Sequence, residues 1–158
     1  MKPTMRLSER RLDELLAHIG GSAVSPGAGV AGAIALALAV ACASKAVSIT
    51  LKHHSDSPEL LSALATFRSI EAAALDVGDR DARAFEAFVH ERDTSSITRL
   101  VCEVEKFRDL VVALTSAIEQ VEPKIQANMV GDLIAAKALV SAAQRIQQQN
   151  EAEATKAR

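Results

Sequence analysis

The chain has 158 residues, of which 49% are hydrophobic and 24% are charged, the balance of a folded domain rather than of a disordered segment. Its formal net charge of -2 argues against a nucleic-acid-binding protein, which needs a basic face to displace counterions from phosphates. Trp and Tyr are absent and Phe occurs four times, so the core must be built from small and aliphatic side chains, which favours helices over strands.

The first predicted elements are two helices joined by a short elbow. An amphipathic helix runs from about residue 8 to residue 19 and stops at Gly20-Gly21. The elbow, Ser25-Pro26-Gly27-Ala28-Gly29, follows it. The second helix begins at residue 27 or 28 and continues to about Leu51. Because it is apolar on nearly every side, it is predicted to be enclosed by neighbouring helices.

The apolar residues 30–43 raise the alternatives of a signal peptide and a membrane span. The residues before this run do not fit a signal peptide, because residues 1–18 carry acidic as well as basic side chains and form an amphipathic helix of their own. The run is also short and rich in Ala and Gly, and Lys45 follows it closely. We therefore expect a core helix, no membrane association and a cytoplasmic location.

Three long helices are predicted after this one. Ser57-Pro58-Glu59 is a helix start signal, with Ser as N-cap and Pro at the first helical position. That third helix extends to about residues 90–92, and a turn at 93–95 opens the fourth, which Pro123 ends or kinks. The fifth covers about 124–152, with a solvated, frayed end. We expect one all-α domain over residues 1–158, an up-and-down bundle of about five helices.

The length of these helices predicts a homodimer. The third helix would span ~50 Å at 1.5 Å per residue, more than a compact monomer of this size needs. Helices of this length bury their apolar faces more fully in a bundle shared with a second copy.

Polar side chains interrupt two of the apolar stripes. Asp81 falls within the stripe of the third helix, and Asn128 and Asp132, one turn apart, fall on the inner face of the fifth. A carboxylate on such a face must be hydrogen-bonded, paired or protonated. Two interpretations stay open: structural hydrogen bonds to helix ends or basic side chains, or a polar site inside the bundle.

The elbow is a third candidate feature. Because Gly27 and Gly29 have no side chain, another group can approach the backbone closely at these residues. The free N–H groups at the N-terminus of the second helix would point outward toward such a group. This arrangement suits an anion or a carbonyl group, although Pro and Gly before a helix often do no more than turn the chain. The four histidines are scattered without metal-ligand spacing, so no metal site is expected.

Several segments together resemble one family. They are Leu12-Asp13-Glu14-Leu15-Leu16, the elbow extended to Gly32, Asp81-Ala82-Arg83-Ala84-Phe85, and Asn128-Met129-Val130-Gly131-Asp132-Leu133 followed by Ala135-Ala136. In this order they are similar to the formiminotransferase-cyclodeaminase C-terminal domain family, which includes the stand-alone methenyltetrahydrofolate cyclohydrolases. The resemblance spans nearly the whole chain, through short motifs.

The resemblance implies an all-helical, intertwined dimer that handles tetrahydrofolate one-carbon units. The implied reaction is hydrolysis of 5,10-methenyltetrahydrofolate or loss of ammonia from the 5-formimino form, with the folate as substrate and no separate cofactor. Asn128 would bind the pterin or the bridging unit, and the elbow would hold a carbonyl or carboxylate of the folate. The candidate residues are Asp81 and Asp132 as catalytic groups, and Ser25, Pro26, Gly27, Gly29 and Asn128 as substrate-binding groups.

Two departures from the family pattern define an alternative. Ala28 replaces the middle one of the three glycines that usually follow the elbow proline, and the chain is short between Asp93 and Ser96, where relatives carry an extra helical stretch. These differences keep open a non-catalytic helical dimer that retains the fold as a scaffold or regulatory partner.

Overall fold

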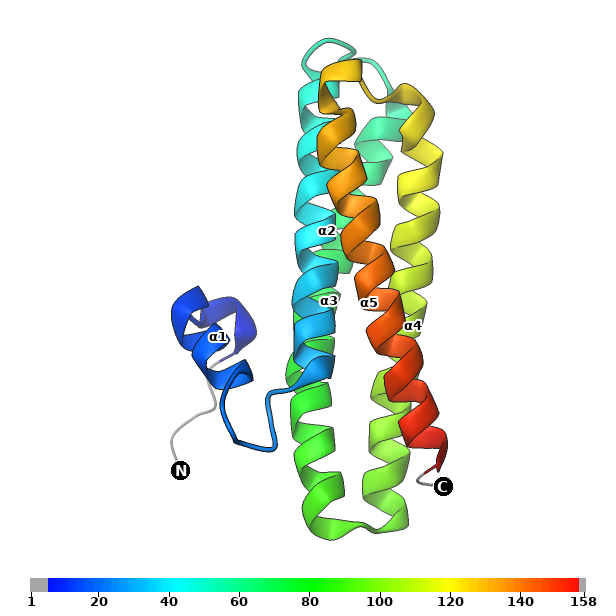
Figure 1. Ribbon diagram of the computed structural model, residues 1–158. Helices are drawn as coiled ribbons and strands as arrows, with labels where there is room; N and C mark the ends of the chain where they lie inside the picture. Colours follow the sequence, from blue (N-terminus) through cyan, green and yellow to red (C-terminus); the bar gives the residue numbers. More distant parts are fainter. Residues whose placement is uncertain (1–5, 157–158) are drawn as a thin grey trace.

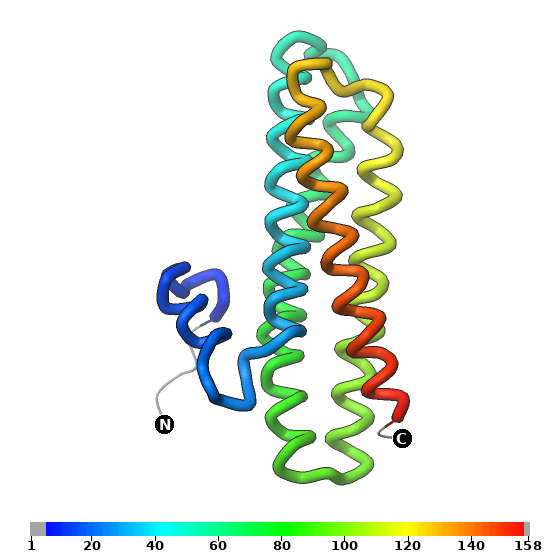
Figure 2. The backbone as a smooth tube through the Cα atoms, viewed as in Figure 1, coloured from blue at the N-terminus to red at the C-terminus, as the bar shows by residue number. Residues whose placement is uncertain are grey.

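A computed structural model describes residues 6–156, which contain five α-helices and no strand. Four long helices run alternately up and down as a bundle (Figures 1 and 2). They are α2 (Ala28–Leu51), α3 (Pro58–Glu91), α4 (Thr94–Val121) and α5 (Val130–Lys156). The short helix α1 (Leu12–Ile19) lies outside the bundle, beside the first turns of α2. The predicted all-α, up-and-down architecture is therefore confirmed.

The core forms around α2. This helix packs along α3 on one side and α5 on the other, and α4 lies diagonally opposite it. Leu36 and Val40 of α2, Phe67 of α3 and Leu114 of α4 are completely buried. Many of the α2 side chains are alanines, so the core is built mainly from small and aliphatic side chains, as the absence of Trp and Tyr predicted.

By length and composition α2 is also apolar enough to cross a membrane, with a mean hydropathy of 2.0 over its most apolar window. Half of that window is buried inside the protein. The core helix of a bundle has the same composition, and the burial of the inner face of α2 agrees with the predicted core role.

The predicted ends of α3 and the start of α4 agree with the structure. Ser57 precedes α3 as its N-cap residue, and Arg92 ends α3 in the left-handed conformation, with φ of 51°. The Asp93 side chain then accepts a hydrogen bond of 2.7 Å from the Ser96 backbone N–H, and the Asp93 N–H donates to Ser96 Oγ at 3.2 Å. This reciprocal cap makes the connection between α3 and α4 very short.

The predicted bounds of the fifth helix are wrong at both ends. Two 3₁₀ turns, Glu122–Lys124 and Ala127–Met129, separate α4 from α5, and the backbone N–H of Gln126 donates to Thr50 Oγ1 at 3.3 Å. These contacts hold the connection against the end of α2, so the helix begins only at Val130. At the other end it continues to Lys156, because Gln147 is buried against the bundle.

The N-terminal segment is held on the bundle by few contacts. Leu7 and Leu15 pack on Val30, and the backbone N–H of Leu7 donates to both carboxylate oxygens of Asp79 at 3.1 and 3.2 Å.

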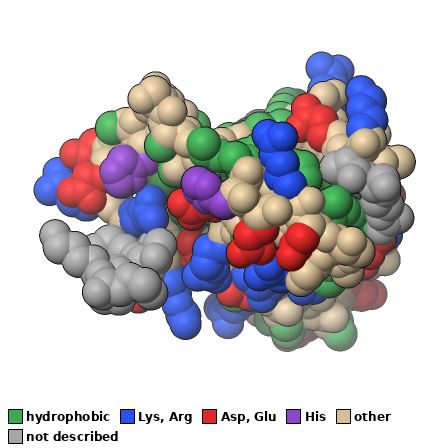
Figure 3. Space-filling model, turned by 90° about the horizontal axis from the view of Figure 1, so that it is seen from below, with side chains coloured by type: hydrophobic (Ala, Val, Ile, Leu, Met, Phe, Trp, Pro, Cys, Tyr) green, Lys and Arg blue, Asp and Glu red, His purple; other side chains and the backbone are tan. Residues whose placement is uncertain are grey.

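Seen from this end of the bundle, the surface carries acidic and basic side chains interspersed over the same face (Figure 3).

Candidate functional site

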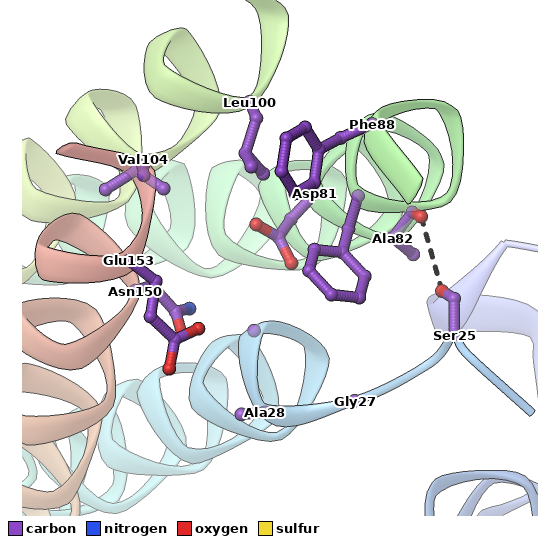
Figure 4. Close-up of a pocket in the computed structure, with 13 residues that line it drawn as sticks. Ser25, Gly27, Ala28, Asp81, Ala82, Phe88, Leu100, Val104, Asn150 and Glu153 are labelled. Atoms are coloured by element: carbon purple, nitrogen blue, oxygen red, sulfur yellow. Dashed lines mark hydrogen bonds between the residues drawn. The ribbon is translucent and has the colours of Figure 1, made fainter. Parts of the chain in front are cut away.

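A pocket of about 150 Å³ opens where the elbow joins α2 (Figure 4). All four long helices contribute to it, because the first turn of α2 meets the second half of α3, the start of α4 and the end of α5. Its lining residues are Ser25, Gly27, Ala28, Gly29, Asp81, Ala82, Phe85, Phe88, Leu100, Val104, Asn150, Glu153 and Ala154.

The carboxylate of Asp81 occupies the space that a side chain at position 29 would need. A Cβ atom built on Gly29 would lie 1.9 Å from Asp81 Oδ2 and 2.6 Å from its Cγ. Only glycine permits this approach between α2 and α3. The elbow is tied to α3 at the next residue of that helix, where Ser25 Oγ donates to the carbonyl oxygen of Ala82 at 3.3 Å.

The first turn of α2 leaves its backbone donors available. Gly27 is the N-cap residue and supplies no side-chain cap, so the first N–H groups of the helix lack an intrahelical acceptor. These N–H groups carry a partial positive charge, and the carboxyl groups of Asp81 and Glu153 line the same pocket. This end of α2 is therefore suited to a carbonyl oxygen or an anion.

Asp81 is half-buried in the pocket and has no side-chain or backbone partner among the described residues there. Within residues 6–156, no hydrogen-bond donor or cation lies within bonding distance of it. Burial, together with the negative charge of Glu103, raises the pKa of Asp81 from 3.8 to about 6. Near neutral pH the group therefore exists in both protonation states.

Glu103 of α4, the second acid in this region, is fully paired. Arg80 Nε donates to it at 2.8 Å and Lys106 Nζ at 2.7 Å, and Arg80 also pairs with Asp76. Burial acts to raise the pKa of Glu103, but hydrogen bonds from Lys106 and Arg80 outweigh it and hold that pKa below its ordinary value. Glu103 therefore stays charged, and it contributes the repulsion that acts on Asp81.

The remaining walls are apolar on one side and polar on the other. Phe85 and Phe88 of α3, with ring centroids 6.3 Å apart, form an aromatic wall. Asn150 and Glu153 come from the last turns of α5, on the side of the pocket that Asp81 faces (Figure 4). The arrangement combines a carboxyl group of raised pKa, free backbone donors and a flat apolar surface, which together suit acid–base chemistry on a ring compound.

The comparisons with known proteins agree with this description. The family model for formiminotransferase-cyclodeaminase matches residues 11–100, which include the elbow and Asp81. The chain belongs to this family. Its fold is similar to the crystal structure of a formiminotetrahydrofolate cyclodeaminase from Thermotoga maritima, with a TM-score of 0.89 and 18% sequence identity over 94% of this chain and 80% of that chain. No curated protein sequence matches the chain.

In this family member, the predicted site residues fall into two groups. Asp81, Ser25, Gly27 and Gly29 line the pocket, and Pro26 lies between two of these residues without lining it. The other predicted residues, Asp132 and Asn128, lie near the opposite end of the bundle.

The separation of the two groups follows from their contacts with α2. Asp132 Oδ1 pairs with Lys45 Nζ at 3.2 Å, whereas Asp81 contacts Gly29. Residues 29 and 45 of one helix are ~24 Å apart along its axis. Within one chain, Asp81 and Asp132 therefore do not share a site.

Asn128 also differs from its predicted position. It is exposed in the 3₁₀ turn before α5 and does not face inward. The prediction extended the helical period of α5 back to this residue, but the helix begins at Val130. Asp132, in the first turn of α5, has a side chain 27% exposed and pairs with Lys45, whose side chain is 64% exposed.

Sequence reasoning missed the contribution of α5 to the pocket. Asn150 and Glu153 lie in a segment of polar residues that reads as a solvated helix end. The neighbouring Ala154 is buried, which only the structure shows, because the sequence around it is polar and carries no apolar stripe. Glu103 is also buried and was detectable as a carboxylate on the inner face of α4.

Proposed function

We propose that the protein catalyses a reaction at the one-carbon unit of a tetrahydrofolate derivative. The substrate is 5-formiminotetrahydrofolate, which would lose ammonia, or 5,10-methenyltetrahydrofolate, which would be hydrolysed. One observation carries the proposal: Asp81, a carboxyl group with a pKa of about 6, lies unpaired in a pocket of a formiminotransferase-cyclodeaminase family member.

Both reactions require proton transfer at the nitrogen or oxygen atoms that are bonded to the one-carbon unit. In deamination, N10 attacks the formimino carbon and loses its proton, and ammonia departs with an added proton. In hydrolysis, water adds to the bridging carbon and gives up a proton; the hydroxyl then loses its second proton as the bond to N5 breaks, and N5 takes up a proton. An acid that is present in both protonation states near neutral pH serves as acceptor and donor in either reaction.

The elbow would orient the substrate. The first backbone N–H groups of α2 can donate to a carbonyl oxygen of the folate, and Gly29 allows the substrate and Asp81 to approach the same point of the backbone. This chemistry requires no separate cofactor and no metal ion.

We extend the proposal to a homodimer in the cytoplasm, with the second copy completing the site. An outward apolar stripe on α2 supports it: Ala31, Ile34, Leu38 and Ala41 follow one another at helical spacing, and Leu38 is 51% exposed. Gly29 and Lys45 lie ~14 and ~10 Å on either side of Leu38 along the axis.

A two-fold axis near Leu38 would pair the two α2 stripes in antiparallel orientation. The partner's Lys45 and the partner's Asp132 would then lie within about one helical turn of the Asp81 pocket. This arrangement would bring together the two groups of predicted residues that one chain keeps apart.

The alternative is a non-catalytic helical dimer that acts as a scaffold or regulatory partner. A thermal-shift experiment with 5-formyltetrahydrofolate, a stable analogue, separates the two. A ligand at 100 to 1,000 times its Kd should raise the free energy of unfolding by about 3 to 4 kcal/mol. If millimolar ligand leaves the melting temperature unchanged, the scaffold is the better description.

Turnover measurements test the chemistry itself. Ammonia release from the formimino substrate and hydrolysis of the methenyl substrate are measured on the same preparation, so that the two reactions are distinguished. Asp81→Asn and Asp132→Asn should reduce turnover strongly, and neither should lower the stability enough to account for that loss. Glu119→Gln removes an exposed carboxylate of α4 outside the pocket and serves as the control. Turnover by Asp81→Asn at the wild-type rate would refute the proposed role of Asp81.

A further inference from the structure

We infer that the pocket receives the pterin end of the folate, with Glu153 and Asn150 of α5 on its pyrimidine edge and the glutamate tail outside. The inference rests on the proposed function and assigns roles to two residues outside the segment that matches the family model. Three properties of the pocket lead to it: its size, its charge and its hydrogen-bonding groups.

The size of the pocket limits what it encloses. Its volume of about 150 Å³ is below the roughly 300–1,000 Å³ of pockets that bury a whole drug-sized ligand. A folate consists of a bicyclic pterin, a benzoyl ring and a glutamate in a row. The pocket therefore holds one end of the molecule and leaves the other end outside.

The charge of the pocket selects the pterin end. The ionisable side chains that line it, Asp81 and Glu153, are both acidic, and no Lys or Arg of residues 6–156 lines it. The glutamate end of a folate carries two carboxylates, which these groups would repel. The partner's Lys45 and the partner's Asp132, which the proposed dimer would bring near the pocket, form an ion pair and add no net charge. The pterin end carries no negative charge and presents several N–H donors.

The polar groups of α5 match the donor pattern of a pterin. Its pyrimidine ring presents a ring N–H and an amino group side by side, next to a carbonyl oxygen, and a carboxylate accepts two such parallel hydrogen bonds. Glu153 is exposed at the rim of the pocket. Its Oε1 accepts one hydrogen bond, from Gln149 at 2.8 Å, and its Oε2 has no donor within residues 6–156, so this oxygen is open to a ligand. Asn150 has no hydrogen-bond partner in that range either, so its amide can donate to the ring carbonyl.

The orientation that results places the reacting atoms correctly. Asp81 on α3 faces Asn150 and Glu153 across the pocket (Figure 4). In a pterin, N5 belongs to the second ring, on the far side from the amino group. A ring held by α5 at its pyrimidine edge therefore directs N5 and the bridging carbon toward Asp81, with one ring face along Phe85 and Phe88.

Binding of folate fragments to the full chain tests this arrangement. Calorimetry gives the Kd of 5-formyltetrahydrofolate, and competition tests pterin and p-aminobenzoylglutamate as its two separate ends. We expect pterin to compete and p-aminobenzoylglutamate not to compete. Glu153→Gln should raise the Kd of 5-formyltetrahydrofolate and pterin about tenfold or more, the usual effect of losing a charge-assisted hydrogen bond. Asn150→Ala should weaken both less strongly.

The control is Glu119→Gln, which removes the same charge ~22 Å along α4 from Val104 of the pocket. If 5-formyltetrahydrofolate binds but Glu153→Gln behaves like this control, the assignment of Glu153 is overturned while the proposed function stands. Competition by p-aminobenzoylglutamate in place of pterin overturns the orientation in the same way. If neither folate nor pterin binds the wild-type chain, the proposed function itself fails.

Discussion

At the scale of single residues, the Asp81 carboxylate lies against the backbone at Gly29 with no donor or cation within bonding distance among residues 6–156. Asp81 is half-buried, and a carboxylate withdrawn this far from water in a structural role is normally compensated by hydrogen bonds or a paired cation. Glu103, in the third turn of α4, shows the compensated form, with Arg80 and Lys106 on its two oxygens. The contrast between these two acids is the main argument that Asp81 has a functional role.

We predict that Asp81→Asn stabilises the protein in a pH-dependent manner. The pKa of Asp81 is about 6 in the folded protein and 3.8 as the model value. The free energy of unfolding therefore falls as the pH rises from about 4 through about 6, and it falls no further from this group above about pH 6. Asn does not titrate, so the variant should gain up to about 3 kcal/mol in free energy of unfolding at about pH 7.5 and almost nothing below about pH 4.

Chemical denaturation across this pH range measures the effect. Asp132→Asn is the matched comparison, because it removes a carboxylate in a surface ion pair with Lys45, and its effect should stay within about 1 kcal/mol. A destabilised Asp81→Asn at neutral pH would show that the carboxylate has a structural partner, contrary to the structure.

At the scale of elements, the elbow and the first turn of α2 pack against α3 at Asp81 and Ala82. Ser25 ties the elbow to the carbonyl oxygen of Ala82, and Gly29 admits the neighbouring Asp81 side chain. Because successive residues of α3 make these two contacts, a shift between α2 and α3 would disturb both. The contacts that pack α2 against α3 therefore also determine the geometry of the pocket.

A double-mutant cycle tests this contact. Gly29→Ala places a methyl group 1.9 Å from Asp81 Oδ2, so the Asp81 side chain must move and the protein should lose about 1 to 3 kcal/mol of stability, as in other overpacked sites. In the Asp81→Ala background the clash is absent, and Gly29→Ala should be neutral or stabilising by up to about 1 kcal/mol, because Ala favours a helix over Gly.

Urea denaturation of the four proteins of the cycle gives the coupling energy between the two positions. Gly131→Ala, in a helical position with no atom within 4 Å of the added methyl, controls for helix propensity alone. Additive effects of Gly29→Ala and Asp81→Ala would contradict the close contact.

At the scale of the whole molecule, apolar side chains remain exposed along α2 and the start of α5. Leu38 of α2 and Val130 and Ile134 of α5 are examples. In the proposed homodimer the second copy covers the α2 stripe of Ala31, Ile34, Leu38 and Ala41. Within residues 6–156, Ile34 also packs against the cluster of Leu7, Leu15 and Val30, whereas Leu38 stays exposed, and α3 and α5 already occupy two other sides of α2.

We predict that Leu38→Glu converts the protein to monomers. Leu38 lies at the centre of the stripe and is 51% exposed, so a charge there should leave the folded chain intact while two like charges would meet at the two-fold axis. Light scattering at micromolar concentration measures the mass. Val112→Glu, at a residue 63% exposed on α4, is the matched control and should remain dimeric. A monomeric wild-type protein under these conditions would refute the dimer.

Much of the fold was predictable because its signals are local. Ser57 and Asp93 mark the starts of α3 and α4, and the alanine-rich composition of α2 marks a core helix. These are properties of adjacent residues, which propensity, capping and periodicity describe well. Asp81 could also be singled out, because a carboxylate within an apolar stripe is visible in the sequence without any tertiary information.

The composition of the site depended on the tertiary structure. Periodicity assigned Asp81 and Asp132 to inward faces of different helices, but only the bundle topology decides which ends of those helices meet. The structure brings Asp81 to the elbow and to Glu153, and leaves Asp132 beside Lys45. The sequence by itself therefore determined the helices, the family resemblance and the unusual carboxylate, whereas the packing of α2 against α3 and α5 decided what surrounds it, because burial and neighbouring charge are set by residues distant in the chain.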